Sequence, residues 1–382
     1  MSWPRAALLL LSSSSRTGPA EGLISLAREA RQRGVETRFA ADTVRPGENL
    51  GEHLAHAGVP WEKDLRLSRR VRLGDVLHDA RLLAEWARSG RFDVLHAGFA
   101  HDHYLCLWAA SRTRRDDLRV VRAAQRAVDV TPGMLGQRRW ALRRSDGVIV
   151  HCAAYRDRLL AHGVDPARIA VVPAGVDAAW FSPGRAPELR ARWGVPEEAP
   201  LAGIVARMKP ERGHRVLLEA FAKALRQVPE AHLVLVGRGE DEPALRELAG
   251  RLAPARIHFG GYLRGPGLVE AYRALDVAIW LREGNDGACR GVLEAMACGL
   301  PVIAGDEGAA ADLVRDGVHG RVVDAADPAR IAAALADLLG DLRSARKMGA
   351  GARARAEEFT PARAAEETLA FWRRLPDLPR AS

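Results

Sequence analysis

The sequence contains few cysteines, and their positions exclude several classes of protein. The four cysteines are Cys106, Cys152, Cys289 and Cys298, and none of them form a pair at the spacing of metal ligands. A disulfide framework is not expected, because disulfide-rich scaffolds are short and dense in cysteine, whereas this chain has 382 residues. We therefore expect buried free thiols in a reducing compartment.

The sequence also lacks a long apolar segment at its N-terminus, where the apolar run covers only residues 6–11. A helix that spans a bilayer needs about 20 apolar residues, and no convincing signal-peptide cleavage site follows the run. We interpret residues 6–12 as a first strand and expect a cytoplasmic protein. There is no internal repeat beyond the alternation described below, and no low-complexity segment long enough to be disordered.

Aromatic residues are scarce, at 5% of the chain, whereas 57 Lys and Arg outnumber 48 Asp and Glu to give a formal net charge of +9. The aromatic residues are scattered singly and form no stripe with the cations, so we expect no nucleic-acid partner. The positive excess favours nucleotide diphosphates or acidic lipid surfaces. The Arg-rich residues 66–73 are compatible with peripheral docking on an anionic membrane and equally with a solvated face.

Short apolar runs alternate regularly with helical segments along the whole chain. The expected strands are residues 6–12, 36–41, 94–96, 120–123, 148–150, 201–205, 233–236, 257–259, 277–281 and 302–304. This alternation predicts an α/β fold with doubly wound parallel sheets. Because Pro173 and Gly175 close a strand before the turn-rich residues 181–184, we predict two domains, 1–178 and 179–360, followed by a C-terminal helix in 361–382.

The most specific pattern lies in residues 286–305. Asp286 follows the expected strand 277–281 in a Gly-rich loop, and Glu294 lies eight positions later, in the first turns of a predicted helix. Ionised carboxylates accept hydrogen bonds from the paired hydroxyls of a ribose or a hexose, and a helix N-terminus favours negative charge. Taken alone, Asp286 would be interpreted as a helix-start acid and Glu294 as a solvated surface residue.

The complete string, an acid, seven residues and then Glu-Ala-Met-Ala-x-Gly-x-Pro-Val, resembles the donor-site signature of glycosyltransferase family 4, whose members are retaining GT-B glycosyltransferases. In that family the first acid is usually Glu, so Asp286 is one methylene shorter. Glu283 lies nearby, but its spacing to Glu294 does not fit. The resemblance implies two Rossmann-like domains that face each other across a cleft, with the last helix, in 361–382, running back toward the first domain.

The resemblance also implies which residues contact the donor diphosphate. Arg207 and Arg212 follow the expected strand 201–205, and basic side chains at a strand's carboxyl end are suited to binding a diphosphate. Arg212 stands where Lys is usual, and Lys209 is interpreted as a bystander. Gly18, in the loop after the first strand, is also expected to face a donor phosphate, because glycine lets a ligand approach the helix start.

Further residues are implied to contact the donor's nucleoside and sugar. Glu294 would hold the ribose, while Asp286 and the backbone N–H groups of Gly287 and Ala288 would position the sugar. The loop containing Gly237 and Gly239 would border the base and ribose. A dinucleotide site in that loop is disfavoured, because the third glycine is missing and three acids occupy the place of a pyrophosphate.

Three histidines follow or end one expected strand, and His-x-His spacing occurs in zinc sites. The candidates are His96, His101 and His103, with Asp102 among them. No further cluster of ligands supports a metal, and the family is metal-independent, so we expect neither metal nor cofactor. We interpret His96 and His101 as residues at the cleft edge that are either acceptor contacts or simply polar loop residues. The family's sugar-contacting histidine corresponds to Gln125, a departure from the pattern.

The resemblance implies a retaining, metal-independent glycosyltransferase of the hexosyltransferase class. It would transfer a sugar from a nucleotide-diphosphate donor to a hydroxyl of a glycan or lipid-linked acceptor, for example in lipopolysaccharide or other cell-surface glycan synthesis at the cytoplasmic face of the inner membrane. The donor phosphate would accept the proton, so Asp286 is not a nucleophile. The alternatives are a GT-B-fold sugar-nucleotide epimerase or phosphorylase, and a non-catalytic nucleotide-sugar-binding subunit. The departures at Asp286 and Gln125 keep the last alternative open.

Overall fold

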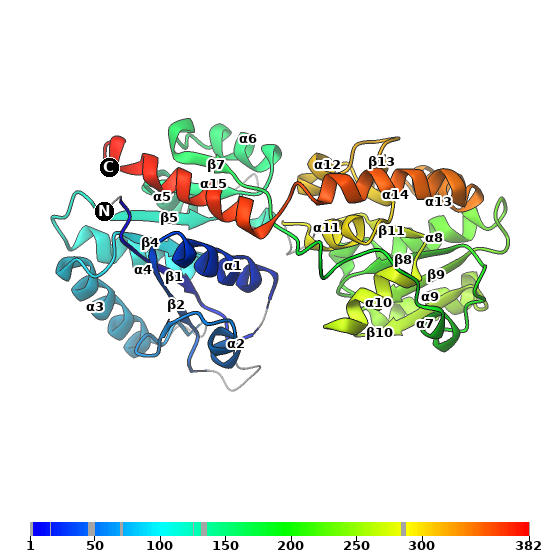
Figure 1. The fold of residues 1–382 in the computed structure, drawn as a ribbon, viewed down its shortest axis with the longest axis horizontal. Coiled ribbons are helices and arrows are strands. Elements are labelled where there is room, and N and C mark those ends of the chain that lie inside the picture. The colour runs from blue at the N-terminus through cyan, green and yellow to red at the C-terminus, as the bar shows by residue number, and fades with distance from the viewer. Residues whose placement is uncertain are drawn as a thin grey trace. The chain divides into compact units, whose positions relative to one another are not determined.

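The structure is a computed structural model that describes residues 3–15, 17–44, 50–68, 72–124, 126–130, 136–283 and 288–381. The chain divides into two compact units (Figure 1). The first unit comprises Met1–Gly175, Pro361–Ser382 and, among the described residues, also Ala288, and the second comprises Val176–Gly284 and Cys289–Thr360. Each unit is built around its own parallel sheet. Asp286, Gly287 and Gln125, which carry sequence-based predictions, lie outside the described residues.

Within the described residues, the first unit contains a seven-stranded sheet in the order β3-β2-β1-β4-β5-β6-β7, and its strand pairs are parallel. The strands are β1 (Ala6–Leu11), β2 (Glu36–Ala41), β3 (Trp61–Glu62), β4 (Val94–Ala97), β5 (Arg119–Ala123), β6 (Gly147–Val150) and β7 (Ile169–Val171). The α-helices are α1 (Gly18–Gln32), α2 (Leu50–His56), α3 (Leu73–Ser89), α4 (Ala100–Ser111), α5 (Gln137–Arg143), α6 (Ala153–Ala161) and α15 (Pro361–Arg374).

Strand β1 at the centre of this sheet is buried on both faces, which explains why it is a continuous apolar run in the sequence. All six residues of β1 are buried. Helix α15, the last of the chain, lies beside α1 (Figure 1) and places Leu369, Phe371 and Trp372 in the same core as Leu9. A Cβ atom on Gly147 would lie 2.7 Å from the Phe371 ring. The end of the chain therefore completes the core of the first unit.

The second unit contains a six-stranded sheet within the described residues, in the order β10-β9-β8-β11-β12-β13 and again parallel. The strands are β8 (Leu201–Val205), β9 (His232–Val236), β10 (Ile257–Gly261), β11 (Val277–Trp280), β12 (Val302–Gly305) and β13 (Gly320–Val323). The α-helices are α7 (Pro187–Arg192), α8 (His214–Ala224), α9 (Glu242–Leu252), α10 (Pro266–Ala274), α11 (Arg290–Ala297), α12 (Gly308–Leu313), α13 (Pro328–Gly340) and α14 (Leu342–Ala356).

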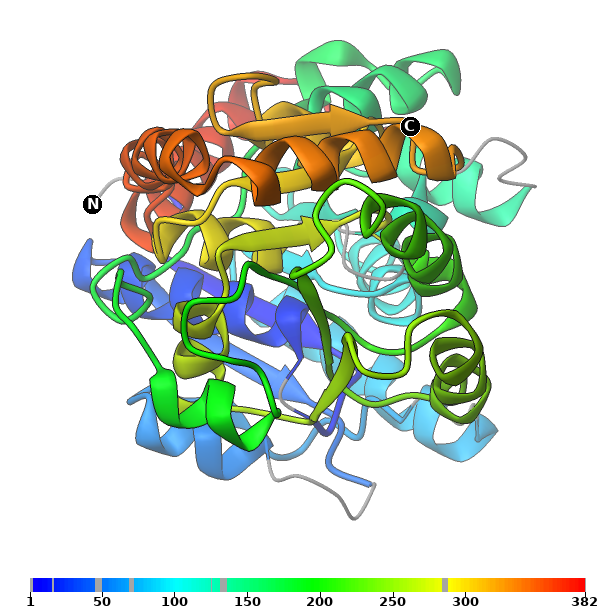
Figure 2. The same ribbon diagram turned by 90° about the vertical axis from the view of Figure 1, so that its right-hand side faces the viewer.

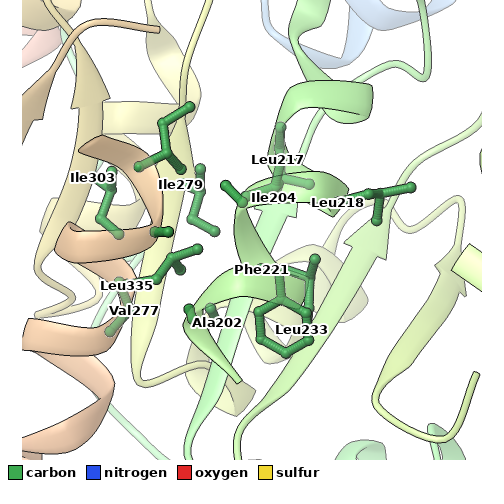
Figure 3. Packing of buried hydrophobic residues seen from close by; sticks show 14 of the residues in the cluster. Ala202, Ile204, Leu217, Leu218, Phe221, Leu233, Val277, Ile279, Ile303 and Leu335 are labelled. Atoms are coloured by element: carbon green, nitrogen blue, oxygen red, sulfur yellow. The ribbon is translucent and has the colours of Figure 1, made fainter. Parts of the chain in front are cut away.

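Helices cover both faces of the second sheet, as Figure 2 shows. Helices α8 and α13 pack against each other over one face and close its core. Figure 3 shows how side chains of α8, such as Leu217 and Phe221, and Leu335 of α13 meet Ile204 and Ile279 from the strands. Burial of these side chains removes apolar surface from water and is the main term that stabilises the unit.

Both sheets confirm the predicted doubly wound parallel fold. The strand order reverses between β1 and β4 in the first unit and between β8 and β11 in the second. In open α/β sheets, ligands bind outside the carboxyl ends of the strands at such a reversal. The four cysteines are buried and form no disulfide, as expected. In the described part of the chain, no helix combines the length and the apolar character needed to span a membrane.

Two buried histidines of the first unit predict that it loses stability in acid. Burial, with the nearby charge of Arg122, lowers the pKa of His96 and of His103 to about 3. Unfolded histidine has a pKa of about 6.5, so the unfolded chain takes up protons first as the pH falls. These histidines therefore do not lower the free energy of unfolding above pH 6.5. Below that pH the free energy of unfolding falls progressively toward pH 3, by up to about 1.4 kcal/mol per pH unit for each histidine.

We predict that His96→Phe, which keeps a ring against Trp372 at a centroid distance of 5.6 Å in the wild type, reduces this acid sensitivity. Urea unfolding of the wild type and the variant at pH 7.5 and pH 5.0 measures it. His56→Gln, at an exposed position on α2, is the control and should retain the wild-type pH dependence. An equal loss of stability in His96→Phe and the wild type would contradict the prediction.

Candidate functional site

The reversal point of the second sheet brings together two connections, and the first of them carries the predicted phosphate-binding residues Arg207 and Arg212. After β8 the chain passes through residues 206–209 and a short 3-10 helix, Pro210–Arg212, before α8 begins at His214. After β11 it enters the connection to α11 with Leu281, Arg282 and Glu283. Both connections leave the carboxyl ends of neighbouring parallel strands, so they lie at the edge of the sheet where ligands collect.

The two glycines of the β9–α9 loop allow that loop to pack directly against residues 206–208. A Cβ atom on Gly237 would lie 2.0 Å from the Ala206 carbonyl oxygen, and one on Gly239 would lie 1.9 Å from that of Met208. The Met208 N–H donates to the Arg238 carbonyl over 3.1 Å. This packing gives both glycines a structural role that the sequence did not predict, while their contact with a nucleoside stays a prediction.

Arg207 lies between Ala206 and Met208, the two residues against which the glycines pack, and its side chain is exposed. Its carbonyl oxygen accepts a hydrogen bond of 3.0 Å from the Lys209 N–H, but among the described residues its side chain makes no hydrogen bond or ion pair. Lys209 differs, because its ammonium lies 3.8 Å from a carboxylate oxygen of Glu240 and 3.9 Å from one of Glu211. Arg207 is thus the more available cation, consistent with the interpretation of Lys209 as a bystander.

Arg212 is buried, with 6% of its surface exposed. Its Nη1 donates a hydrogen bond to the Glu283 carbonyl oxygen, and its guanidinium carbon lies 4.1 Å from the centre of the Trp280 ring. His214, which begins α8, is also buried, and its burial and the charge of Arg212 lower its pKa to about 4. His214 is therefore neutral near pH 7, and Arg212 is the cation at this position.

Glu283, the acid that competes with Asp286 in the sequence, is directed toward the start of α12. A Cβ atom on Gly308 would lie 2.4 Å from its Oε1 atom. Its carbonyl oxygen accepts the Arg212 hydrogen bond. Glu283 therefore connects the β11 loop to α12 and to the buried cation. The position of Asp286, which would test its assigned role, is not described.

Glu294 lies on α11 and is not a solvated surface acid, because only 12% of its side chain is exposed. The Tyr272 hydroxyl donates a hydrogen bond of 3.0 Å to its Oε2, and Arg290 Nη2 lies 3.7 Å from its Oε1. Ala288 is half-buried. The next residue, Cys289, lies immediately before the helix and has a left-handed φ of +47°. The contacts with Tyr272 and Arg290 orient the Glu294 carboxylate. These two contacts were not predicted from the sequence.

The predicted residues of the first unit lie near its own reversal point. Gly18 is the first residue of α1, and the Thr17 side chain caps this helix by accepting a hydrogen bond of 3.4 Å from the Ala20 N–H. His101 is half-buried in the first turn of α4. The contact of Gly18 with a donor phosphate and that of His101 with an acceptor therefore stay predictions.

His96 lies elsewhere than expected. We predicted an acceptor-side residue at the edge of the unit, but only 2% of its surface is exposed and its ring contacts Trp372 of α15 in the interior. The physical reason is strand alternation, which directs His96 toward the same face as Val94, the face that α15 covers. Its ring is therefore not offered to an acceptor.

The remaining residues of the histidine segment support the fold. Nε2 of the buried His103 lies 2.8 Å from the Ser145 hydroxyl. Asp102 is buried and accepts hydrogen bonds from the backbone N–H groups of Ser12 and Phe99. Among the described residues, no group of three or more His, Cys, Asp and Glu side chains could hold a metal ion.

The two doubly wound parallel sheets have the fold of GT-B glycosyltransferases. Solved structures agree with this fold. The Anabaena protein HepE, determined with UDP and glucose, has a TM-score of 0.79 at 20% identity over 96% of this chain and 98% of that one. A glycosyltransferase of Rickettsia africae has a TM-score of 0.81 at 19% identity over 97% and 98%. At these identities the similarity shows the fold alone.

The chain belongs to glycosyltransferase family 4. The family model described as Glycosyltransferase Family 4 matches residues 17–180, and that described as Glycosyl transferases group 1 matches residues 186–355. A D-inositol 3-phosphate glycosyltransferase of Stackebrandtia nassauensis is 30% identical over 92% of this chain and 86% of its own length. A phosphatidyl-myo-inositol mannosyltransferase of Mycobacterium leprae is 30% identical over 87% and 86%. The match to a Geodermatophilus obscurus relative, at 36% identity, spans only 52% of that protein.

The close packing at Gly239 predicts a large difference between two glycine substitutions in the second unit. Gly239→Ala should lower the free energy of unfolding by about 2–3 kcal/mol, because the new methyl group would overlap the Met208 carbonyl. Gly250→Ala, inside α9 with no atom within 4 Å of its Cβ position, should instead stabilise by about 0.5–1 kcal/mol. Urea unfolding measures both, and equal effects of the two substitutions would contradict the described packing.

Proposed function

We propose that the protein transfers a sugar, with retention of anomeric configuration and without a metal, from a nucleotide-diphosphate donor to a hydroxyl acceptor. The observation that carries this proposal is the pair of arginines at the reversal point of the second sheet. Arg212 is buried and held by its neighbours, whereas the Arg207 side chain is exposed. Two guanidinium groups suit a diphosphate, because each can donate two parallel hydrogen bonds to phosphate oxygens.

In the proposed mechanism, Arg207 and Arg212 stabilise the negative charge that develops on the leaving diphosphate as its bond to the sugar breaks. Glu294, oriented by Tyr272, accepts hydrogen bonds from the ribose hydroxyls. The acceptor oxygen attacks the anomeric carbon from the face that the diphosphate leaves, and a phosphate oxygen of the leaving group takes the acceptor's proton. Cations fixed in advance need no reorganisation during the reaction.

For the acceptor, we propose a hydroxyl on a phosphate-bearing polyol or lipid headgroup. Relatives are named for transfer to D-inositol 3-phosphate and to phosphatidyl-myo-inositol, and the net charge of +9 favours an anionic acceptor. A lipopolysaccharide acceptor also carries phosphate and is the second arm of the test below.

A donor site at Arg207 predicts that one nucleotide stabilises the protein in the absence of metal. We expect UDP, GDP or ADP, tested separately at about 100 times the dissociation constant, to add about 2.7 kcal/mol to the free energy of unfolding and so raise the apparent melting temperature. Arg207→Ala should abolish most of this increase, because the exposed cation supplies binding rather than stability. Arg343→Ala, at an exposed position on α14, is the matched control and should retain it. If no nucleotide stabilises the wild type, the donor-site assignment is wrong.

The proposed chemistry predicts the configuration of the product. The hexose conjugates of whichever nucleotide stabilises the wild type should be turned over in the presence of EDTA. Inositol phosphates and lipopolysaccharide core fragments are tested as acceptors in parallel. NMR coupling constants of the product should show the anomeric configuration of the donor. An inverted product would contradict retention, while binding without turnover on either acceptor class would favour the non-catalytic alternative.

A further inference from the structure

The indole of Trp280 lies between a predicted phosphate-binding cation and the start of α11. Trp280 is the last residue of β11, and only 5% of its surface is exposed. The Arg212 guanidinium carbon lies 4.1 Å from the centre of its ring. Close to the same indole, a Cβ atom on Gly291 would lie only 2.3 Å from the ring atom Cζ3. Glycine at this position is what allows the helix to approach the ring.

We propose that Trp280 is a positioning residue for the donor diphosphate, because its ring supports the Arg212 guanidinium in the orientation that binds phosphate. This inference rests on the proposed function. A guanidinium that lies over an aromatic face is attracted to the ring. The hydrogen bond to the Glu283 carbonyl fixes the rotation of the group. The proposed function assigns this guanidinium to the donor phosphates.

The contact with Gly291 extends this role to the helix start. Gly291 follows Arg290 and precedes Glu294 by about one turn of α11. The Trp280 ring therefore sets how closely the helix that carries the ribose-binding carboxylate approaches the buried cation. Trp280 Nε1 is buried and has no hydrogen-bond partner among the described residues. The ring itself, rather than its N–H group, makes the contacts, so phenylalanine should substitute for it.

The test compares Trp280→Leu with Trp280→Phe, using whichever of UDP, GDP and ADP stabilises the wild type. Calorimetry should show that Trp280→Leu weakens nucleotide binding by about tenfold, which lies within the range for the loss of a cation–π contact. Trp280→Phe should bind within about threefold of the wild type. Equal affinity of Trp280→Leu and the wild type would overturn the inference and leave the donor site intact. Absence of nucleotide binding to the wild type would overturn the proposed function itself.

A second variant separates positioning from stability. Gly291→Ala should lower both the melting temperature and the affinity, because its methyl group displaces the indole. In the double variant Trp280→Leu/Gly291→Ala, the smaller leucine leaves room for the methyl group, so the melting temperature should recover relative to Gly291→Ala. The affinity should stay as low as in Trp280→Leu. Recovery of affinity together with stability would overturn the inference, because it would mean that the ring acts only through packing.

Discussion

The burial of one positive charge is the constraint on which the site of the second unit depends. A buried guanidinium is costly unless its charge and its donors are satisfied. Arg212 meets this requirement through the Trp280 ring and the Glu283 carbonyl, both on or just after β11, although Arg212 itself follows β8. The charge therefore ties together the connections that leave the two strands where the sheet reverses. It also holds the guanidinium in place before any ligand arrives.

Arg207, the second cation, is held in place only through its backbone. The backbone on either side of Arg207 packs against Gly237 and Gly239 so closely that neither glycine could carry a side chain, yet the Arg207 side chain is exposed. One arginine is thus pre-organised by side-chain contacts, and the other is anchored only through its backbone. A pre-organised group loses little entropy on binding, whereas an exposed side chain loses more but can adapt to its ligand. In the proposed function, this difference between the two arginines suits a diphosphate that binds as part of the donor and leaves as part of the nucleotide product.

The sequence predicted the central architecture because buried parallel strands are continuous apolar runs, and β2 and β8 have the predicted bounds. It did not predict β13 at the sheet edge, because two of its four residues are only half-buried and the strand begins with glycine. For the candidate site, motif spacing predicted Arg207, Arg212 and Glu294, and their roles stay predictions. It did not identify the Trp280 stack, because that contact joins residues far apart in the chain, and nothing local to either residue specifies it.

The position of His96 follows from the same kind of long-range contact. A histidine at the carboxyl end of a parallel strand resembles a ligand-binding residue, because that edge of the sheet is where ligands collect. Strand alternation, however, directs it to the face with Val94, and what covers that face is decided by α15 at the other end of the chain. Since Trp372 of that helix packs on the ring, protonating His96 would place an unsolvated charge in the core. The identity of the covering helix, rather than the strand that carries the residue, therefore makes His96 part of the core of the first unit.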